Sequence, residues 1–481
     1  MRKWAIIFLT VFIAVLFSIT AAMQHHLLWM ASACVVLAML GWVVLRLDWM
    51  HYLLLLIAIT LPFSVEIPFI GNSMLRVPGE PLIMLAAFVF ATELLVSRFR
   101  VLKSRLSGEW LWVMPLVASF ILTIPFSTML MVSLKFSFIN LLYILVFFAL
   151  LSQELKRKPE LFLRMIFLYS LGLLLVLCWG IYRLWQWEWN PVVMRGVFHP
   201  FFNDHTIFGA SAALVGALWL GSLPEAENKS TGLLHIFFAV VLFSTVLFST
   251  SRAAFLSLFV FAGVWLVLIS GIRFRYMAGM LAVVLLLGFF MRGPVLERVG
   301  RVEVLSYDSH AGLLERTQSV ANVSTDASNI ERLNRWIAAW RMFKEKPFTG
   351  FGPGTWQFAY IPYQEPALEN HLTVTNLWDP PEGSGGTAHS EYLLALSEMG
   401  FAGLLGWLLI LGRLGYLAMK KSRFHPNRRL IIAAMAALST YFFHAHFNNF
   451  LTTDKFAFLF WGTMAWLVAL YHEKNTSPGQ L

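Results

Sequence analysis

The fold is decided by residues 233–270, which read LLHIFFAVVLFSTVLFSTSRAAFLSLFVFAGVWLVLIS. Two apolar runs lie here on either side of the polar junction Thr250-Ser251-Arg252. Each run has about the 20 residues that an α-helix needs to cross the hydrocarbon core of a bilayer. We therefore expect two membrane-spanning helices that meet at Arg252.

The same pattern recurs along almost the whole chain. Hydrophobic residues make up 58% of the sequence and charged residues only 13%, whereas about 25% of the residues in a soluble domain are charged. Apolar runs begin near residues 4, 27, 50, 80, 110, 136, 161, 207, 233, 253, 276, 391, 430 and 456. These runs predict an all-α polytopic membrane protein with about 12 to 14 transmembrane helices. The lower number applies if the runs near residues 50 and 110, which contain proline, do not cross the membrane.

Basic residues form short clusters between the apolar runs, a pattern that indicates membrane topology and not nucleic-acid binding. With the N-terminus in the cytoplasm, every strong cluster is cytoplasmic, namely Arg98–Arg105, Lys156–Lys158, Arg273–Arg275 and Lys420–Arg429. The external side then receives residues 68–79, 185–206, 292–390 and 449–455 together with the junction at Arg252. Functional residues are expected on that side.

This topology divides the chain into three regions. Residues 1–291 are expected to form N-terminal transmembrane helices, residues 292–390 one long external loop, and residues 391–481 C-terminal transmembrane helices. Residues 1–22 have the basic start and small-residue end of a signal peptide, but further spans follow at once and favour a first transmembrane helix. Cys34 and Cys178 lie in apolar runs, so neither a disulfide framework nor a thiolate metal site is expected.

The long loop changes character near Glu331. An amphipathic helix at the bilayer surface is predicted beyond it, because apolar and charged residues there follow helical spacing. Its apolar face is expected to hold Leu333, Trp336, Ile337, Trp340 and Phe343, with Arg335, Arg341, Lys344 and Glu345 elsewhere around the helix. Pro347 ends the helix, and Gly350, Gly352 and Gly354 then form a tight turn.

His389 is the strongest candidate for chemistry, since it ends the long loop in Thr387-Ala388-His389-Ser390-Glu391-Tyr392, just before a span. A histidine there titrates near neutral pH and is able to accept a proton from a sugar hydroxyl. The alternative is an interfacial histidine that caps the following helix.

Three arginines accompany this histidine on the external side. Arg252 lies between two apolar runs, where its planar guanidinium suits a phosphate partner, although an arginine at a helix end also snorkels to the interface. Arg332 and Arg335 stand at the start of the predicted surface helix, where membrane lipid headgroups are the alternative partners, and Arg335 is a candidate for substrate binding.

Residues 195–205 place Arg195, His199, Asn203, Asp204 and His205 in one short external loop. Arg195 and Asn203 are candidates for substrate binding, whereas the spacing of the two histidines is irregular and does not predict a metal site. Trp185, Trp187 and Trp189 precede the loop and are typical of a membrane-interface belt, although they are also able to stack on sugar rings. The sequence has neither an Asp-x-Asp pair nor a P-loop, which disfavours a cytosolic enzyme that uses nucleotides.

Several of these motifs, in this order, resemble the O-antigen ligase and O-antigen polymerase superfamily. They are Thr250-Ser251-Arg252-Ala253, Arg332 four residues before Trp336, Pro347-Phe348-Thr349-Gly350-Phe351-Gly352-Pro353-Gly354, Ala388-His389-Ser390-Glu391-Tyr392-Leu393 and Glu398-Met399-Gly400 with Gly403. The resemblance covers about residues 195 to 415, with Ser390 where many relatives have asparagine.

The resemblance implies a membrane glycosyltransferase of the GT-C type in the bacterial inner membrane, with its active site facing the periplasm. Its donor would be an undecaprenyl-diphosphate-linked glycan, and its acceptor lipid A core or a growing glycan, without metal or other cofactor. His389 would be the base on the acceptor hydroxyl, and Arg252 and Arg332 would hold the diphosphate. Ligation to lipid A core, polymerisation and attachment to protein all remain open.

Two other classes of function also remain open. A transporter or flippase would carry charged residues near span centres and have broken helices, whereas most of the arginines and histidines here lie at external helix ends. His444 and His446 are the exceptions. A structural scaffold of an envelope assembly would have no cavity.

Overall fold

The computed structural model describes residues 50–70, 73–96, 113–226, 228–271, 327–381, 386–417 and 425–472. Several expected features lie outside these ranges, and they are the spans near residues 4, 27 and 276, the basic clusters Arg98–Arg105 and Arg273–Arg275, the boundary at residue 291 and the possible signal peptide. The three-region division of the chain therefore stays a prediction.

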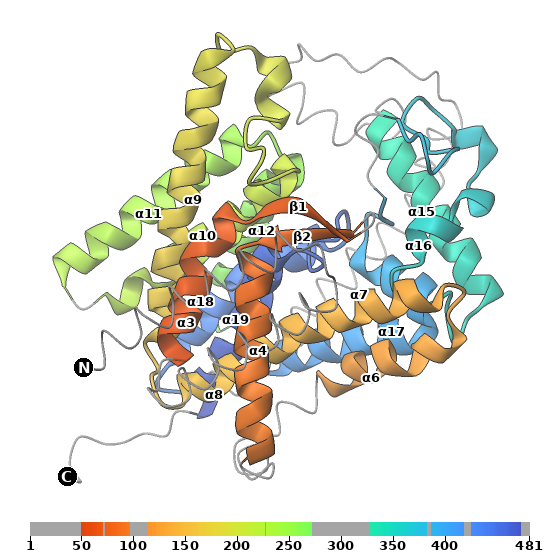
Figure 1. The fold of residues 1–481 in the computed structure, drawn as a ribbon. Coiled ribbons are helices and arrows are strands. Elements are labelled where there is room, and N and C mark those ends of the chain that lie inside the picture. Colours follow the sequence, from red (N-terminus) through yellow and green to blue (C-terminus); the bar gives the residue numbers. More distant parts are fainter. Residues whose placement is uncertain are drawn as a thin grey trace, which may run out of the picture.

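The described part is a bundle of apolar helices with a small hairpin and a loop region at one side (Figure 1). The bundle helices are α3 Met50–Thr60, α4 Gly79–Val96, α6 Met114–Thr123, α7 Leu130–Tyr143, α8 Leu151–Leu155, α9 Leu161–Gln186, α10 His205–Ser222, α11 Lys229–Phe248, α12 Arg252–Ser270, α17 Glu391–Tyr416, α18 Arg428–His444 and α19 Asp454–His472. A π-helical segment, Ile144–Leu150, joins α7 to α8. Short 3-10 helices cover Leu61–Phe63, Ile124–Phe126, Pro191–Arg195, Leu223–Glu225, Ile361–Tyr363 and Pro366–Leu368.

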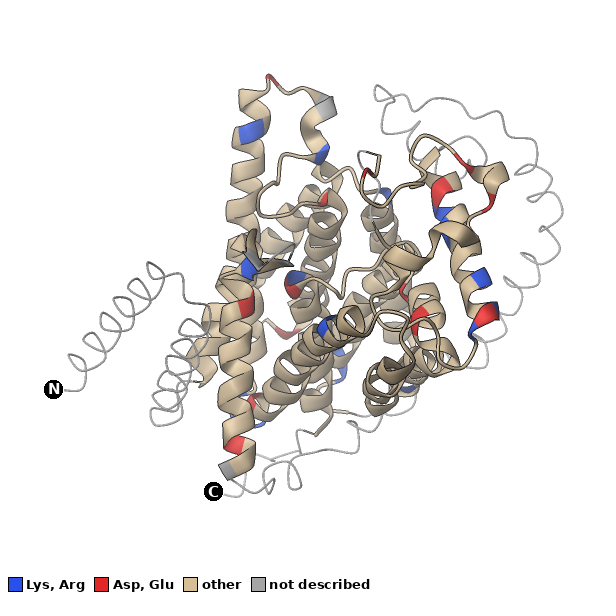
Figure 2. Cartoon of the chain, turned by 45° about the vertical axis from the view of Figure 1, so that its right-hand side comes forward, with Lys and Arg blue, Asp and Glu red and all other residues tan. Residues whose placement is uncertain are grey.

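The helix starts confirm the apolar pattern, because each described helix of the bundle except α7 and α8 begins within about four residues of a predicted run, and α7 begins at Leu130, ahead of the run predicted near residue 136. Six helices in the described ranges are long and apolar enough to cross a membrane, and they are Leu130–Leu155, Leu161–Gln186, His205–Glu225, Lys229–Phe248, Arg252–Ser270 and Glu391–Tyr416. Figure 2 shows that Lys, Arg, Asp and Glu occupy only scattered positions along the ribbon. The chain is therefore an all-α polytopic membrane protein.

Close packing in the bundle centres on α10, which contacts α11, α12 and α18. Small residues on α10 allow this approach, since a Cβ atom on Gly221 would lie 2.9 Å from the Cβ of Ala433 in α18. α19 is buried along almost its whole length. These contacts place α10, α12 and α18 side by side.

A two-stranded antiparallel hairpin, β1 Val65–Ile70 and β2 Ser73–Val77, was not predicted. It lies across one end of the bundle (Figure 1), where Arg76 forms a cross-strand ion pair of 3.0 Å with Glu66. Arg76 also donates a hydrogen bond of 3.0 Å to the carbonyl oxygen of Thr452. The hairpin is therefore tied to the segment between α18 and α19.

The predicted helix of the long loop is α15, Ala327–Glu345, and it begins before Leu333. The predicted apolar face was wrong in part: Phe343 is buried as expected, but Trp340 is 49% exposed, and the charged Arg335 is fully buried. Besides Phe343, the buried face carries Ala327, Ile330, Glu331, Asn334, Arg335, Ala338, Ala339 and Met342. Glu331 and Arg335 neutralise each other at 2.8 Å, and the alanines let α15 pack against α17.

The predicted tight turn follows α15, and Gly350, Gly352 and Gly354 all have positive φ. It docks against the backbone of α17 where Gly400, with φ 63° and ψ −155°, interrupts that helix. Three backbone hydrogen bonds of 2.9 to 3.1 Å join the two segments, from Phe351 to Ser397, from Gly352 to Glu398 and from Phe401 to Pro347. The interruption of α17 thus receives the turn and fixes α15 relative to α17.

Candidate active site

The candidate site lies at the end of the bundle where α10 and α12 begin and α18 ends, here called the site end. At the opposite end, Arg428 of α18 donates hydrogen bonds of 3.2 and 3.0 Å to the carbonyl oxygens of Leu268 and Ile269, near the end of α12. Since α18 runs antiparallel to α12, the site end receives Arg252 and His444.

Arg252 is the first residue of α12, and Ser251 caps the helix by accepting a hydrogen bond of 3.3 Å from the backbone N–H of Ala254. Thr250 precedes the cap with φ 54°, a conformation that β-branched residues rarely adopt. A Cβ atom on Gly209, near the start of α10, would lie 3.2 Å from the Cβ of Ser251. The junction that carries Arg252 is therefore packed against the start of α10.

α15 contributes Arg332 and Arg335, and Arg335 is held in place by contacts within the protein. Arg335 donates to Glu331 at 2.8 Å and to the carbonyl oxygen of Thr387 at 2.9 Å. Its guanidinium also lies 5.8 and 5.5 Å from the ring centroids of Trp356 and Tyr360. These contacts hold the backbone just before His389.

His389 has φ 49°, so its backbone is in the left-handed region that non-glycine residues seldom occupy. On one side, Trp336 of α15 donates from its indole nitrogen to the carbonyl oxygen of His389 at 3.3 Å. On the other side, the backbone N–H of Ser390 donates to the Asn449 side chain at 3.1 Å. Such strain persists only where neighbouring structure enforces it, and it is common at functional sites.

Ser390, and not His389, caps α17, because its hydroxyl accepts a hydrogen bond of 3.4 Å from the backbone N–H of Leu393. The capping interpretation of His389 was therefore wrong. The imidazole of His389 is left for another role.

Positive charge surrounds the histidines of the site end. Burial lowers the pKa of His389 well below its ordinary value of 6.5, although part of the residue remains accessible, and the charges of Arg335 and Arg332 lower this pKa further. A backbone interaction with Phe447 opposes these effects. Arg332 also interacts electrostatically with His205 and His444, so it is central to the cluster.

The structure thus brings Arg332 and His389 together and places Arg252 at the same end. Arg195 is exposed in the loop before α10 and interacts electrostatically with His205. Asn203 instead donates a hydrogen bond of 2.9 Å to Glu66 of the hairpin.

Residues 449–455 were expected on the external side, and His444 and His446 were noted just before them, but no residue between α18 and α19 was named as part of the site. Asn449 supports Ser390, and the carbonyl oxygen of Ala445 accepts a hydrogen bond of 2.9 Å from the backbone N–H of Glu391. The only sequence signal was the polar pair Asn448-Asn449 between Phe447 and Phe450.

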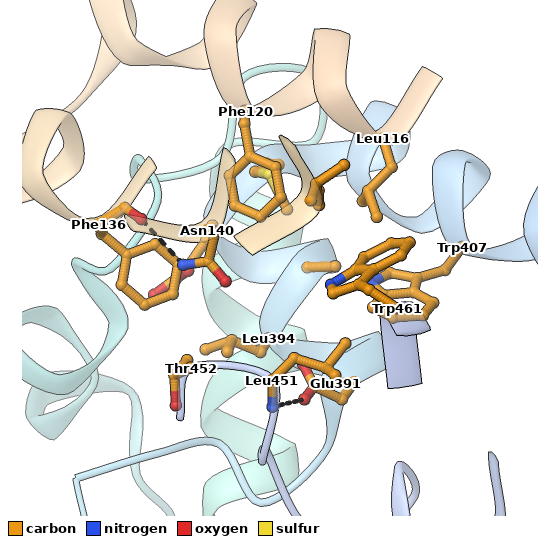
Figure 3. A pocket seen from close by; sticks show the side chains of 14 residues that line it. Leu116, Phe120, Phe136, Asn140, Glu391, Leu394, Trp407, Leu451, Thr452 and Trp461 are labelled. Atoms are coloured by element: carbon orange, nitrogen blue, oxygen red, sulfur yellow. Dashed lines mark hydrogen bonds between the residues drawn. The ribbon is translucent and has the colours of Figure 1, made fainter. Parts of the chain in front are cut away.

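A cavity of about 30 Å³ lies beside this segment, among α6, α7, α17 and α19 (Figure 3). Two carboxyl groups line it, but Glu391 accepts hydrogen bonds from Tyr441 and, at 3.3 Å, from the Leu451 backbone. Glu398 accepts one of 3.0 Å from the backbone N–H of Trp356. A cavity of this size holds only one or two water molecules, so it is not the glycan site.

Within the described ranges, no group of three or more His, Cys, Asp or Glu side chains is arranged to hold a metal ion. The charge available for binding a phosphate there comes from the arginines of the site end.

The comparison with protein families agrees with this arrangement. Residues 237–408 match the family model described as O-Antigen ligase, a range that contains Arg252, Arg332 and His389. No curated protein matches the chain. Residues 237–408 thus carry an O-antigen ligase domain, which supports a relation of this membrane protein to the O-antigen ligase and polymerase superfamily and a role in polysaccharide biosynthesis.

Proposed function

We propose that this protein transfers a glycan from undecaprenyl diphosphate to an acceptor at the periplasmic face of the bacterial inner membrane. The observation that carries the proposal is the position of His389, which is held in a strained backbone between α15 and the α18–α19 segment with Arg332 beside it. The acceptor is lipid A core or a growing glycan.

His389 acts as the base in this proposal. The acceptor hydroxyl oxygen attacks the sugar carbon that is bonded to phosphate, and the hydroxyl proton passes to His389. The bond between that carbon and the phosphate oxygen breaks, and the lipid diphosphate leaves as an anion. A lowered pKa keeps His389 neutral near pH 7, so its imidazole is ready to accept the proton.

Arg252 and Arg332 hold the leaving group. A lipid diphosphate is negatively charged before and after transfer, and it needs fixed positive charge more than it needs an acid. Guanidinium groups stay charged and bind phosphate oxygens through two parallel N–H groups. Arginines at this end therefore supply the charge that a divalent ion supplies in many nucleotide-sugar enzymes.

Arg335 has a different role from Arg252 and Arg332 in this proposal. Arg335 is buried and bonded to Glu331 and Thr387, so we assign it the positioning of His389. Arg195 and Asn203 border the site through the loop before α10, where they would contact parts of the glycan more distant from the diphosphate.

Transport is the second candidate, because the interruption of α17 at Gly400 is a feature of many transporters. Here the turn at Phe351 and Gly352 bonds the carbonyl groups that the interruption frees. An interruption filled in this way is a joint between two segments and does not offer carbonyl groups to an ion.

One experiment tests the proposal directly. The gene is deleted in its native host, and surface polysaccharides are separated on a gel. Loss of long chains from lipid A core indicates a ligase, single repeats on the core indicate a polymerase, and an unchanged pattern refutes both. Purified protein with a lipid-linked donor then separates transfer from transport, since transfer proceeds in detergent without a membrane.

A further inference from the structure

His444 and Asn448 are buried polar residues that the proposed reaction does not use. His444 is fully buried and Asn448 is 4% exposed. Neither ring nitrogen of His444, nor the side-chain nitrogen of Asn448, has a hydrogen-bond partner within the described protein. Native proteins rarely leave such atoms unpaired, because an unpaired buried polar group destabilises the fold.

Both residues belong to the part of the chain that meets His389, because Phe447, next to Asn448, interacts with His389 through its backbone. His444 interacts electrostatically with Arg332, as His389 does. The residue after His444, Ala445, accepts the hydrogen bond from Glu391 that ties the α18–α19 segment to the start of α17. The backbone N–H of Asn448 donates to the carbonyl oxygen of His444 at 2.9 Å, which keeps both residues in one turn.

Packing alone does not explain a histidine at this position. The ring of His444 lies 5.6 Å from the ring of Phe450, a contact that a phenylalanine would make equally well. A phenylalanine would also avoid two unpaired nitrogen atoms. The nitrogens therefore point to a ligand that bonds them.

The type of atom defines that ligand. A neutral imidazole presents one donor and one acceptor, and the amide nitrogen of Asn448 is a donor. Phosphate oxygens bond donors but leave the acceptor nitrogen unpaired. Hydroxyl groups donate and accept, so sugar hydroxyls satisfy all three atoms.

We propose that His444 and Asn448 form a subsite for the sugar that is bonded to the donor diphosphate, beside the phosphate contacts of Arg332. This inference rests on the proposed transfer from a lipid diphosphate and adds residues that recognise its first sugar. The subsite would fix the position of that sugar relative to His389.

The test uses the full-length protein with His444→Phe, which keeps an aromatic ring, and Asn448→Val, which is closer in volume to asparagine than leucine is; both substitutions remove the nitrogens. His446→Phe is the matched control, because His446 is exposed two residues away and bonds the carbonyl oxygen of Phe442 in its own helical turn. For each protein we would measure donor KM, inhibition by free undecaprenyl diphosphate, and Tm in detergent.

Both subsite variants are expected to raise donor KM about tenfold or more, as lost hydrogen bonds to a bound ligand do. Their inhibition by undecaprenyl diphosphate, which lacks the sugar, should stay at the wild-type value, whereas Arg332→Ala weakens it. Their Tm should be unchanged or higher, because an apolar group replaces unpaired polar atoms. His446→Phe should match the wild type throughout.

An unchanged donor KM would overturn the subsite while leaving the proposed function intact. A lower Tm would show that the nitrogens have partners within the protein, and equal weakening of undecaprenyl diphosphate would show a phosphate contact; either result also overturns it. A wild-type protein that transfers no glycan would refute the proposed function, and the subsite with it.

Discussion

Gly400→Ala should disrupt the joint between the two parts of the candidate site. A Cβ atom there would lie 2.5 Å from the carbonyl oxygen of Pro347 and 2.7 Å from that of Phe348, and these are backbone atoms that cannot rotate away. The conformation at Gly400 is also one that only glycine adopts readily. The strained backbone costs on the order of 1 to 3 kcal/mol, and forced overpacking adds about as much.

Together these terms amount to about 2 to 6 kcal/mol, a large part of the roughly 5 to 15 kcal/mol that stabilises a typical protein. To relieve this clash, the turn at Pro347 is expected to detach from α17. Arg332 and His389 would then no longer be held in their present positions relative to each other. Gly412→Ala is the control in the same helix, since a Cβ atom there meets nothing within 4 Å.

Thermal unfolding in detergent and glycan transfer would be measured on both variants. Gly400→Ala should unfold several degrees below the wild type and transfer poorly, while Gly412→Ala should be as stable as the wild type or more so, because alanine favours a helix over glycine. Equal Tm and equal transfer rates for the two variants would refute the docking argument.

Three further predictions concern the chemistry and the topology. His389→Ala should lower the rate of glycan transfer by about 100-fold or more while the protein remains at normal abundance. In the wild type, kcat/KM should fall on the acid side only below pH 6.5, because the lowered pKa keeps His389 neutral down to that pH. A fall that begins above pH 6.5 would contradict this assignment. Arg252→Ala and Arg332→Ala should each cost on the order of 100-fold and Arg252→Lys about tenfold, with Lys344→Ala as an exposed control, and activity should survive EDTA. Wild-type rates in both Arg252 variants, or loss with EDTA that magnesium restores, would reject the diphosphate role. A reporter fused near Ser324 should read external, and a cytoplasmic signal there would place every proposed site residue on the wrong side.

The helices were predictable because membrane spans are coded by local composition. Runs near residues 161, 253 and 391 begin α9, α12 and α17 almost where expected, since backbone groups in lipid must be bonded within the helix. His389 was likewise visible as a titratable residue beside such a run, and Arg332 as a cation at the start of the predicted surface helix.

Contacts between distant segments were not predictable in this way. The face of α15 was misjudged because the burial of Arg335 depends on its hydrogen bonds to Glu331 and to Thr387, and Thr387 lies 52 residues away. The hairpin depends on Arg76 reaching Thr452, and the backbone of His389 depends on Asn449. Spacing along a helix carries no information on such partners.

The length of α9 has a consequence for the acceptor. Its 26 residues extend about 39 Å, which exceeds the roughly 30 Å of bilayer hydrocarbon. If α9 stood upright with its first residue at the opposite hydrocarbon boundary, its end would reach about 9 Å into the headgroup layer. The exposed Trp185 near that end, and Trp187 and Trp189 just beyond it, suit this level, where tryptophan is enriched. The loop that leads from α9 to His205 would begin at this height, so in the proposed reaction an acceptor anchored in the same leaflet would meet the donor by lateral diffusion, whereas a soluble acceptor would have to approach the membrane surface.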